Sequence, residues 1–352
     1  MLGGLSPGVY PYLGASVGIG GLRESVSACG TAVVRGVRGA RLAGKVPSVL
    51  IDPATYEASP KESQEPLLPC DEWLERQRAA GAPLLLTDTG RIRRGDREAL
   101  RKALGRWETL DEPTLVVLPV ESWWLRGGLA CLAEEVRAAG RPVGLVLLDH
   151  YNALDTAGAI SGLLTFLSAV GKLPIVMLRC DVSAVGAVAH GAFAGFAGMS
   201  ASARHGPLPM RRISETDADR ERDDSPAVLV PALHDYHKAS KLPALAHGES
   251  DVTRCDYSCC RGESLLRVTR LYEVDVAAAR AQAYIHNIAA HEHIARRVLG
   301  AEEPKDAWWE SCKAGADTMV SLIEAGVSLS VPRWLRQWLE VGSPSHEPVT
   351  VG

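Results

Sequence analysis

The segment VGLVLLDHYNALDTAGAISGLLTFLSAVGKLPIVMLRCD (143–181) decides the fold class. It begins with an apolar run at 143–150, continues into a stretch at 154–171 that is apolar on two sides, and ends in a second apolar run at 173–181. Short apolar runs bounded by Gly, Pro or an acid are typical of strands buried on both faces of a parallel sheet. The segment therefore predicts a strand, a helix and a second, parallel strand.

The same alternation extends in both directions from this segment. Further strands are predicted over 48–53, 83–90, 114–121 and 191–200, with helices over 71–81, 95–107 and 127–140. Two earlier runs, PYLGAS (11–16) and TAVVRG (31–36), bring the strands to the eight of a TIM (β/α)8-type barrel. An open doubly wound sheet fits repeated βα units equally well by this count alone.

Composition indicates a globular chain, with 46% hydrophobic and 23% charged residues among 352. The net charge of −4 gives no global basic field, so a nucleic-acid partner would need a local basic face. No run of apolar residues is long enough to span a bilayer, and the N-terminus lacks the features of a secretory signal. We therefore expect a cytoplasmic protein without a membrane partner.

A cysteine cluster gives the best chemical signal in the sequence. Cys255, Cys259 and Cys260 lie within six residues, and His286 follows on a predicted helix over 274–299. Zn²⁺ favours thiolate and imidazole ligands, and a structural site takes four of them in a tetrahedron. We therefore predict a structural zinc site, and the alternative is a set of core thiols with a solvated histidine. The other cysteines are scattered singly, which is typical of buried thiols.

Two histidines on the same helix, His291 and His293, are competing ligands. A second helix is predicted from Pro304 to about Ala325, with an apolar stripe for docking formed by Trp309, Cys312, Ala316, Met319 and Ile323. The expected organisation is an α/β barrel over 1–210, a charged exposed loop over 211–226, a zinc-binding subdomain with C-terminal helices over 227–342, and a frayed tail over 343–352.

Four acids end predicted strands: Asp88, Glu121, Asp149 and Asp181. The carboxyl ends of barrel strands build the active site, although acids at these positions also cap helices. Basic residues follow Asp88 directly at Arg91, Arg93 and Arg94 and continue at Arg97, Arg101 and Lys102. They form either a rim that holds phosphates or a solvated helix face.

Together these motifs resemble the queuine and archaeosine tRNA-guanine transglycosylases. That family carries a C-x-C-x2-C motif, followed about 25 residues later by a histidine. The first and last cysteines of the motif fall on Cys255 and Cys260, and the histidine falls on His286. Cys259 substitutes for the middle cysteine. LLLTDTGRIR (84–93) is similar to the family's LTDSGGFQ motif, which places the family's aspartate on Asp88. SAVGAVAHGAFAGFAGMSASARHG (183–206) is similar to the family's last barrel strand and the following loop.

The resemblance implies a zinc-bearing TIM barrel that exchanges guanine for a 7-deazaguanine in tRNA or DNA through a covalent glycosyl-enzyme. It also implies a purine or deazapurine base as substrate and a homodimer or heterodimer as the assembly. Phe196 stands where the family has its nucleophilic aspartate, so Asp149 or Asp181 is expected to replace it while Asp88 handles the base. Arg91, Arg93, Arg204 and Glu121 are the expected substrate-binding residues.

Two rival interpretations stay open. A non-catalytic paralogue, acting as an accessory subunit or a nucleic-acid binding module, would keep the barrel and the zinc without the reacting carboxylate. An unrelated barrel enzyme would carry the zinc loop by coincidence, because one fold serves many functions.

Overall fold

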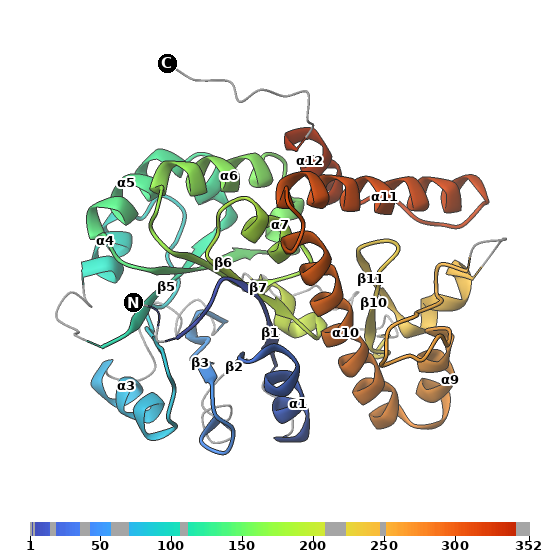
Figure 1. Ribbon diagram of the computed structural model, residues 1–352. Coiled ribbons are helices and arrows are strands. Elements are labelled where there is room, and N and C mark those ends of the chain that lie inside the picture. Colours follow the sequence, from blue (N-terminus) through green and yellow to red (C-terminus); the bar gives the residue numbers. More distant parts are fainter. Residues whose placement is uncertain are drawn as a thin grey trace, which may run out of the picture. The chain divides into compact units, whose positions relative to one another are not determined.

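A computed structural model describes residues 2, 4–14, 19–35, 43–57, 70–105, 112–207, 223–246 and 251–342 (Figure 1). The chain divides into two compact units, Met1–Arg212 and Ile213–Gly352. Most of the loop predicted over 211–226, and the whole tail over 343–352, lie outside the described residues.

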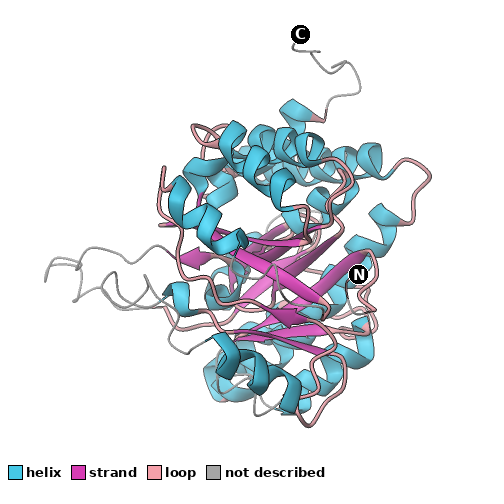
Figure 2. Cartoon of the chain, turned by 90° about the vertical axis from the view of Figure 1, so that its left-hand side faces the viewer, coloured by secondary structure: helices cyan, strands magenta, loops and turns pink. Residues whose placement is uncertain are grey.

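The first unit is a nearly closed, parallel, eight-stranded barrel of the TIM type (Figure 2). Its strands are β1 (Gly8–Leu13), β2 (Ala32–Arg35), β3 (Val49–Asp52), β4 (Leu85–Leu86), β5 (Thr114–Glu121), β6 (Val143–Asp149), β7 (Ile175–Cys180) and β8 (Ala194–Gly198). They pair in the order β3-β2-β1-β8-β7-β6-β5-β4, and the short β9 (Gly206–Pro207) adds to β6. Because β1 pairs with β8, the barrel is confirmed and the open doubly wound sheet is excluded.

Helices surround the barrel (Figure 2). They are α1 (Ile19–Cys29), α3 (Cys70–Ala79), α4 (Arg97–Gly105), α5 (Leu129–Ala139), α6 (Ala159–Val170), α7 (Ser183–Ala189) and α8 (Ala201–Arg204). Short 3-10 helices come after β3, β5 and β6: η1 (Thr55–Glu57), η2 (Ser122–Leu125) and η3 (Ala153–Asp155). Helix α5 ends as its sequence predicts, because Gly140 adopts the left-handed conformation (φ 62°) that closes a helix.

The seam of the barrel lies between β3 and β4, and it explains why the strand predicted over 83–90 is reduced to two residues. The N–H of Leu86 donates to the side-chain oxygen Oε1 of Gln77 at 2.8 Å, and the carbonyl of Leu86 accepts from Gln77 Nε2 at 2.9 Å. Trp73 Nε1 donates to the same carbonyl at 2.8 Å. Side chains of α3 therefore satisfy the backbone groups of Leu86 that a neighbouring strand would otherwise pair with.

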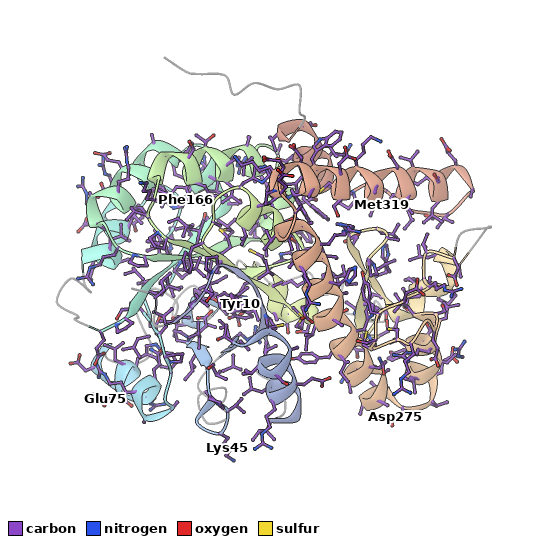
Figure 3. All side chains as sticks on the ribbon, in the orientation of Figure 1. Tyr10, Lys45, Glu75, Phe166, Asp275 and Met319 are labelled. Carbon is purple, nitrogen blue, oxygen red and sulfur yellow. The ribbon has the colours of Figure 1, made fainter. Side chains whose placement is uncertain are left out.

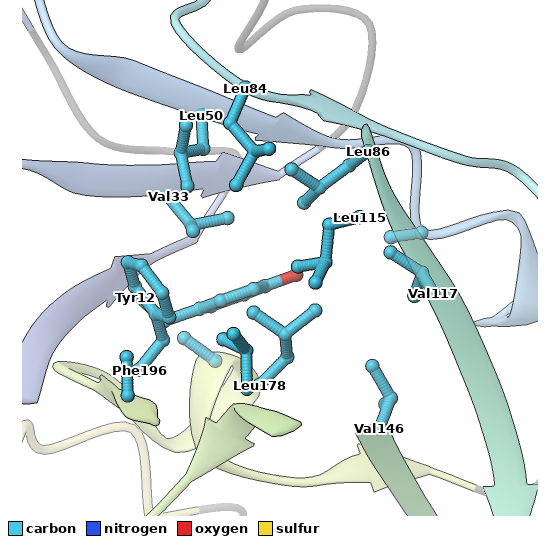
Figure 4. Packing of buried hydrophobic residues seen from close by; sticks show 14 of the residues in the cluster. Tyr12, Val33, Leu50, Leu84, Leu86, Leu115, Val117, Val146, Leu178 and Phe196 are labelled. Atoms are coloured by element: carbon cyan, nitrogen blue, oxygen red, sulfur yellow. The ribbon is translucent and has the colours of Figure 1, made fainter. Parts of the chain in front are cut away.

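Apolar side chains from all the strands fill the inside of the barrel (Figure 4). They include Tyr12, Val33, Leu50, Leu86, Leu115, Val146, Leu178 and Phe196. Phe196 is fully buried, and its ring centroid lies 5.3 Å from that of Tyr10. Phe196 is thus part of the hydrophobic core of the barrel.

The second unit contains a hairpin and four helices. Its elements are β10 (Ala227–Val230), β11 (Asp235–Lys238), η5 (Ala239–Leu245), α9 (Leu266–Val274), α10 (Val276–Leu299), α11 (Pro304–Glu324) and α12 (Arg333–Val341). Strand β11 pairs antiparallel with β10, from Ala227 opposite Lys238 to Val230 opposite Asp235. The helix predicted from 274 begins at Val276, because the side chain of Asp275 caps it by accepting from the N–H groups of Ala277 and Ala278.

The apolar stripe predicted on α11 is partly rotated in the structure. Cys312 and Met319 are buried as expected, and Trp308 is buried where Trp309 was expected (Figure 3 labels Met319). Ile323 is instead 39% exposed. Among the described residues, no helix is long and apolar enough to cross a membrane.

Candidate functional site

The four predicted metal ligands come together in the second unit. The ligand atoms of Cys255, Cys259, Cys260 and His286 all lie within 4.8 Å of one another. His286 Nδ1 is 3.3 Å from Cys260 Sγ and 3.7 Å from Cys255 Sγ, and the sulfurs of Cys259 and Cys260 are 3.5 Å apart. A tetrahedron with metal–sulfur bonds of about 2.3 Å separates its sulfurs by about 3.8 Å. The cluster can therefore hold a metal ion.

A tight turn lets two adjacent cysteines face the same point. The N–H of Cys260 donates to the carbonyl of Tyr257 at 2.8 Å, and the N–H of Glu263 donates to the carbonyl of Cys260 at 3.0 Å. Arg261 (φ 53°) and Gly262 (φ 77°) both adopt the left-handed conformation in this turn. The chain thereby reverses direction, and the N–H of Cys255 reaches the carbonyl of Glu263 at 3.2 Å.

The histidine ligand is oriented from behind. His286 is fully buried, and its Nε2 lies 2.7 Å from the carbonyl oxygen of Leu229 on β10. Because a carbonyl only accepts, Nε2 carries a proton, and Nδ1, which faces the three sulfurs, is the nitrogen that would ligate an ion. Metal-binding histidines are commonly held in this way by a partner on the second nitrogen.

Charge in the cluster also suits a cation. Hydrogen bonds from Cys259 and Cys260 hold the pKa of Cys255 well below its usual range. Burial works to lower the pKa of His286, but hydrogen bonds to Cys255 and Cys259 outweigh it and raise the pKa to about 9. Stabilised thiolate is the form that a metal binds.

The two competing histidines lie outside the ligand cluster. His291 Nε2 hydrogen-bonds to the hydroxyl of Tyr236. His293 stacks against Tyr257, with ring centroids 4.4 Å apart. Both side chains are thus engaged with tyrosine rings.

The barrel's carboxyl-terminal face has a hollow of about 370 Å³ in the first unit. Of the predicted acids, only Asp149 lines it within the described residues. Asp149 Oδ2 accepts from Ser122 Oγ and, at 3.1 Å, from Thr156 Oγ1, while Oδ1 accepts from the N–H of His150 at 2.7 Å. The carboxylate is therefore fixed in orientation and half-buried at the edge of the hollow.

The other two candidate catalytic acids are buried by their neighbours. Asp88 is 4% exposed, and its Oδ1 accepts from Thr55 Oγ1. Asp181 is 6% exposed, and its oxygens accept from Asn152 Nδ2 at 2.7 Å and from the N–H of Ser183 at 2.8 Å. At the carboxyl-terminal face, Asp88 thus links its own loop to that of Thr55, and Asp181 links its loop to that of Asn152.

A buried network that the sequence analysis missed lies on the same face. Asp52, which ends β3, accepts from the hydroxyls of Tyr12 and Tyr56 at 2.6 Å each. The guanidinium of Arg179 lies 5.6 Å from the centroid of each tyrosine ring and donates to Glu57 Oε1. Asp52 ends the run at 48–53, so the signal that identified the other four acids applied to it as well.

Charges in this network are fixed by their partners. Burial, and next the charge of Asp52, raise the pKa of Tyr12 and Tyr56 well above the usual value. Burial tends to lower the pKa of Arg179, but the two tyrosines and Glu57 raise it overall. Arg179 adopts φ 56° at an irregularity in the β7–β8 register, which is a strained conformation for a non-glycine residue.

Glu57 carries this network to the hollow. Its Oε1 also accepts from Arg35 Nη1 at 2.7 Å, and both Glu57 and Arg35 line the hollow. His205 lines it too, and burial lowers the pKa of His205 to about 4, so its imidazole is neutral at pH 7. The hollow thus combines two carboxylates, one guanidinium and the imidazoles of His150 and His205.

The predicted basic rim divides into two groups. Arg97 pairs with Glu134 and Glu135 on α5, and Arg101 also pairs with Glu135, so two acids balance the charge of these two arginines. Arg91 is half-buried, and burial, followed by the charge of Arg93, lowers its pKa, while Glu121 raises it. Arg91, Arg93 and Glu121 therefore form one neighbourhood at the ends of β4 and β5.

Arg204 ends helix α8 and is buried, with 8% of its surface exposed.

Comparison with known proteins identifies no family: no protein-family model and no curated protein matches the chain.

Proposed function

We propose that this chain is a base-exchanging glycosyltransferase of the tRNA-guanine transglycosylase type, acting on guanine in tRNA or DNA. The observation that carries the proposal is the oriented carboxylate of Asp149 in a polar hollow at the carboxyl-terminal face of a TIM-type barrel. This is the face where barrel enzymes place their chemistry. The order of the TDTG motif, the last barrel strand and the Cys3His cluster along the chain supports the same assignment.

Asp149 is the better of the two expected replacements for the nucleophile. Both oxygens accept hydrogen bonds in each carboxylate, but Asp181 is only 6% exposed, whereas Asp149 is half-buried and lines the hollow. In the proposed reaction a carboxylate oxygen of Asp149 bonds to C1′ of the nucleoside as the bond from C1′ to guanine breaks. The incoming base then forms its own bond to C1′ and releases the carboxylate, with a second group handling the proton on the base.

The resemblance gives the proton-handling role to Asp88. The structure buries Asp88 against Thr55, at the end of β4. Burial can tune a carboxylate for proton transfer, provided that the substrate reaches it. The role of Asp88 therefore remains a proposal that the variant below tests.

We propose Zn²⁺ as the ion for the Cys3His cluster. Three thiolates and one imidazole form a closed donor set that zinc prefers, and such sites are structural. His286, oriented by the carbonyl of Leu229, would complete the set that Cys255, Cys259 and Cys260 begin. The ion would connect the loop at 255–260 to α10, which stabilises the second unit.

Exchange of radiolabelled guanine into bulk tRNA and into DNA tests the proposed activity. We expect incorporation by the wild type and a loss of roughly a thousandfold or more for Asp149→Asn, because an amide is a poor nucleophile. The exposed acid Glu98 provides a matched control, and Glu98→Gln should exchange at the wild-type rate. Asp88→Asn and Asp181→Asn complete the series; undiminished exchange in all three aspartate variants would refute these roles.

One observation favours a second candidate, a non-catalytic paralogue that binds nucleic acid. Phe196 replaces the family's nucleophilic aspartate and is built into the hydrophobic core of the barrel. Nucleic-acid binding without base exchange, in the wild type as in Asp149→Asn, would establish this alternative.

A further inference from the structure

The aromatic ring of Tyr151 is exposed to solvent. Its side chain is 81% exposed, and it is the only aromatic residue among the large, exposed hydrophobic residues of the described chain. The others are aliphatic and belong to the second unit: Val274, Val276, Val320 and Ile323. By contrast, Trp73, Trp124 and Tyr56 of the same barrel unit are almost completely buried. Within the described part of this unit, Tyr151 is therefore the ring that is most available to a ligand.

The ring stands at a defined place. Tyr151 lines the same hollow as Asp149, together with Arg35, Glu57 and His205. The hollow therefore offers one flat apolar surface among charged and polar groups. This combination suits a planar ligand that also carries hydrogen-bonding groups.

The backbone on both sides of Tyr151 is held by side chains. Before it, Asp149 Oδ1 accepts from the N–H of His150 at 2.7 Å. After it, Asn152 Oδ1 accepts from the N–H of Leu154 at 3.0 Å, and Asn152 Nδ2 donates to Asp181 at 2.7 Å. The ring is therefore presented from an anchored turn, which reduces the entropy lost when a ligand stacks on it.

We propose that Tyr151 is a stacking platform for an unpaired nucleobase of a bound strand. This inference rests on the proposed function, because it assumes a nucleic-acid partner. Every base has an apolar face that stacks on an aromatic side chain regardless of sequence. Arg35 also lines the hollow, where it is paired with Glu57 at 2.7 Å and adds a charged group beside the ring. The adjacent position of Asp149 places the stacked base next to the proposed reaction centre.

Binding of fluorescein-labelled single strands, DNA and RNA of roughly 12 nucleotides, measured by fluorescence anisotropy, tests the proposal without depending on exchange activity. Tyr151→Ala should weaken binding roughly tenfold, because base–aromatic stacking is lost. Tyr151→Phe should bind as the wild type does, since the ring is retained. Val274→Ser is the matched control, because Val274 is 82% exposed and lies in the second unit; it should leave affinity unchanged.

An abasic series sharpens the test. When single bases are removed from the strand in turn, wild-type binding should weaken for the abasic site at one position. The abasic site at that position should not weaken the binding of Tyr151→Ala any further. Wild-type affinity in Tyr151→Ala would overturn the stacking role and leave the proposed function standing. A wild-type protein that binds neither polymer, tRNA included, would overturn both.

Discussion

Arg179 donates a hydrogen bond to Glu57, although 122 residues separate them in the chain. Arg179 lies in β7, one residue before its end, and Glu57 lies in η1 after β3, so the pair joins two strands' ends that are not neighbours in the barrel. The side chain of Arg179 is 1% exposed and that of Glu57 is 23% exposed. This interaction links the buried Asp52–tyrosine network to the hollow that contains Asp149.

Breaking this pair should destabilise the barrel. We expect Arg179→Met to lower the free energy of unfolding by about 3 kcal/mol, because a largely buried carboxylate loses one of its two cationic partners. The partly exposed position of Glu57 places this value at the low end for buried pairs. Urea denaturation measures the effect. Arg179→Lys keeps the charge, so its free energy of unfolding should lie between those of the wild type and Arg179→Met. An unchanged denaturation midpoint for Arg179→Met would show that the pair contributes nothing to stability.

Loss of a cluster thiol should remove the metal. Cys255→Ala and Cys260→Ala should each reduce bound zinc from about one ion per chain to a small fraction, because structural zinc needs its full tetrahedral set. Elemental analysis of the purified protein gives the stoichiometry. Cys131→Ala is the control, since Cys131 is a free cysteine on α5 outside the cluster. Equal zinc in all of these variants would contradict the site.

Asn287 should position the histidine ligand through β10. Its Oδ1 accepts from the N–H of Leu229 at 2.8 Å and its Nδ2 donates to the carbonyl of Ala227 at 3.0 Å. Asn287→Ala should cost about 2–4 kcal/mol of stability, because it leaves buried backbone groups unpaired. It should also weaken zinc binding by roughly tenfold, because the carbonyl that orients His286 is no longer held. A competition titration with a chromophoric chelator measures the affinity; a stability loss without any change in affinity would limit Asn287 to a structural role.

Acid should destabilise the second unit through His234. Burial lowers the pKa of His234 to about 4, below the ordinary value of 6.5. The unfolded chain therefore takes up the proton first, and stability falls as the pH drops from about 6.5 to about 4, by roughly 3 kcal/mol in total. His234→Asn should remove this part of the pH dependence, and asparagine tolerates the left-handed conformation of this position (φ 55°).

Denaturation at a series of pH values checks this expectation. His237, whose pKa burial also lowers to about 4, contributes a slope of the same sign that persists in His234→Asn. An identical slope in the wild type and in His234→Asn would contradict the assignment.

An aspartate at position 196, where the tRNA-guanine transglycosylases that the sequence resembles carry their nucleophile, should not raise exchange activity. Phe196→Asp would place a carboxyl group in the barrel core, where the wild-type residue is fully buried beside Tyr10. We expect a loss of about 4 kcal/mol or more, from the lost ring and the buried polar group together. Thermal unfolding and the guanine-exchange assay measure the two effects. A stable Phe196→Asp variant with raised exchange would show that the reacting position is still at Phe196.

Local patterns were sufficient to predict most of the barrel. The runs at 114–121 and 143–150 became β5 and β6 almost residue for residue, because a strand buried on both faces must be apolar throughout. The run at 83–90 predicted too long a strand, because Gln77 of α3 takes the backbone groups of Leu86. The spacing of residues 83–90 gives no indication that a side chain of α3 pairs with this backbone.

The alternation of strands and helices and the four residues of the cysteine–histidine cluster could be predicted from the amino-acid pattern. These features follow from side-chain polarity and spacing along the chain. The position of Asp149 in the hollow, the burial of Asp88 and Asp181, and the pairing of Arg179 with Glu57 become visible only in the folded chain. Burial and pairing depend on which strands become neighbours when the barrel closes, and that relationship is long-range.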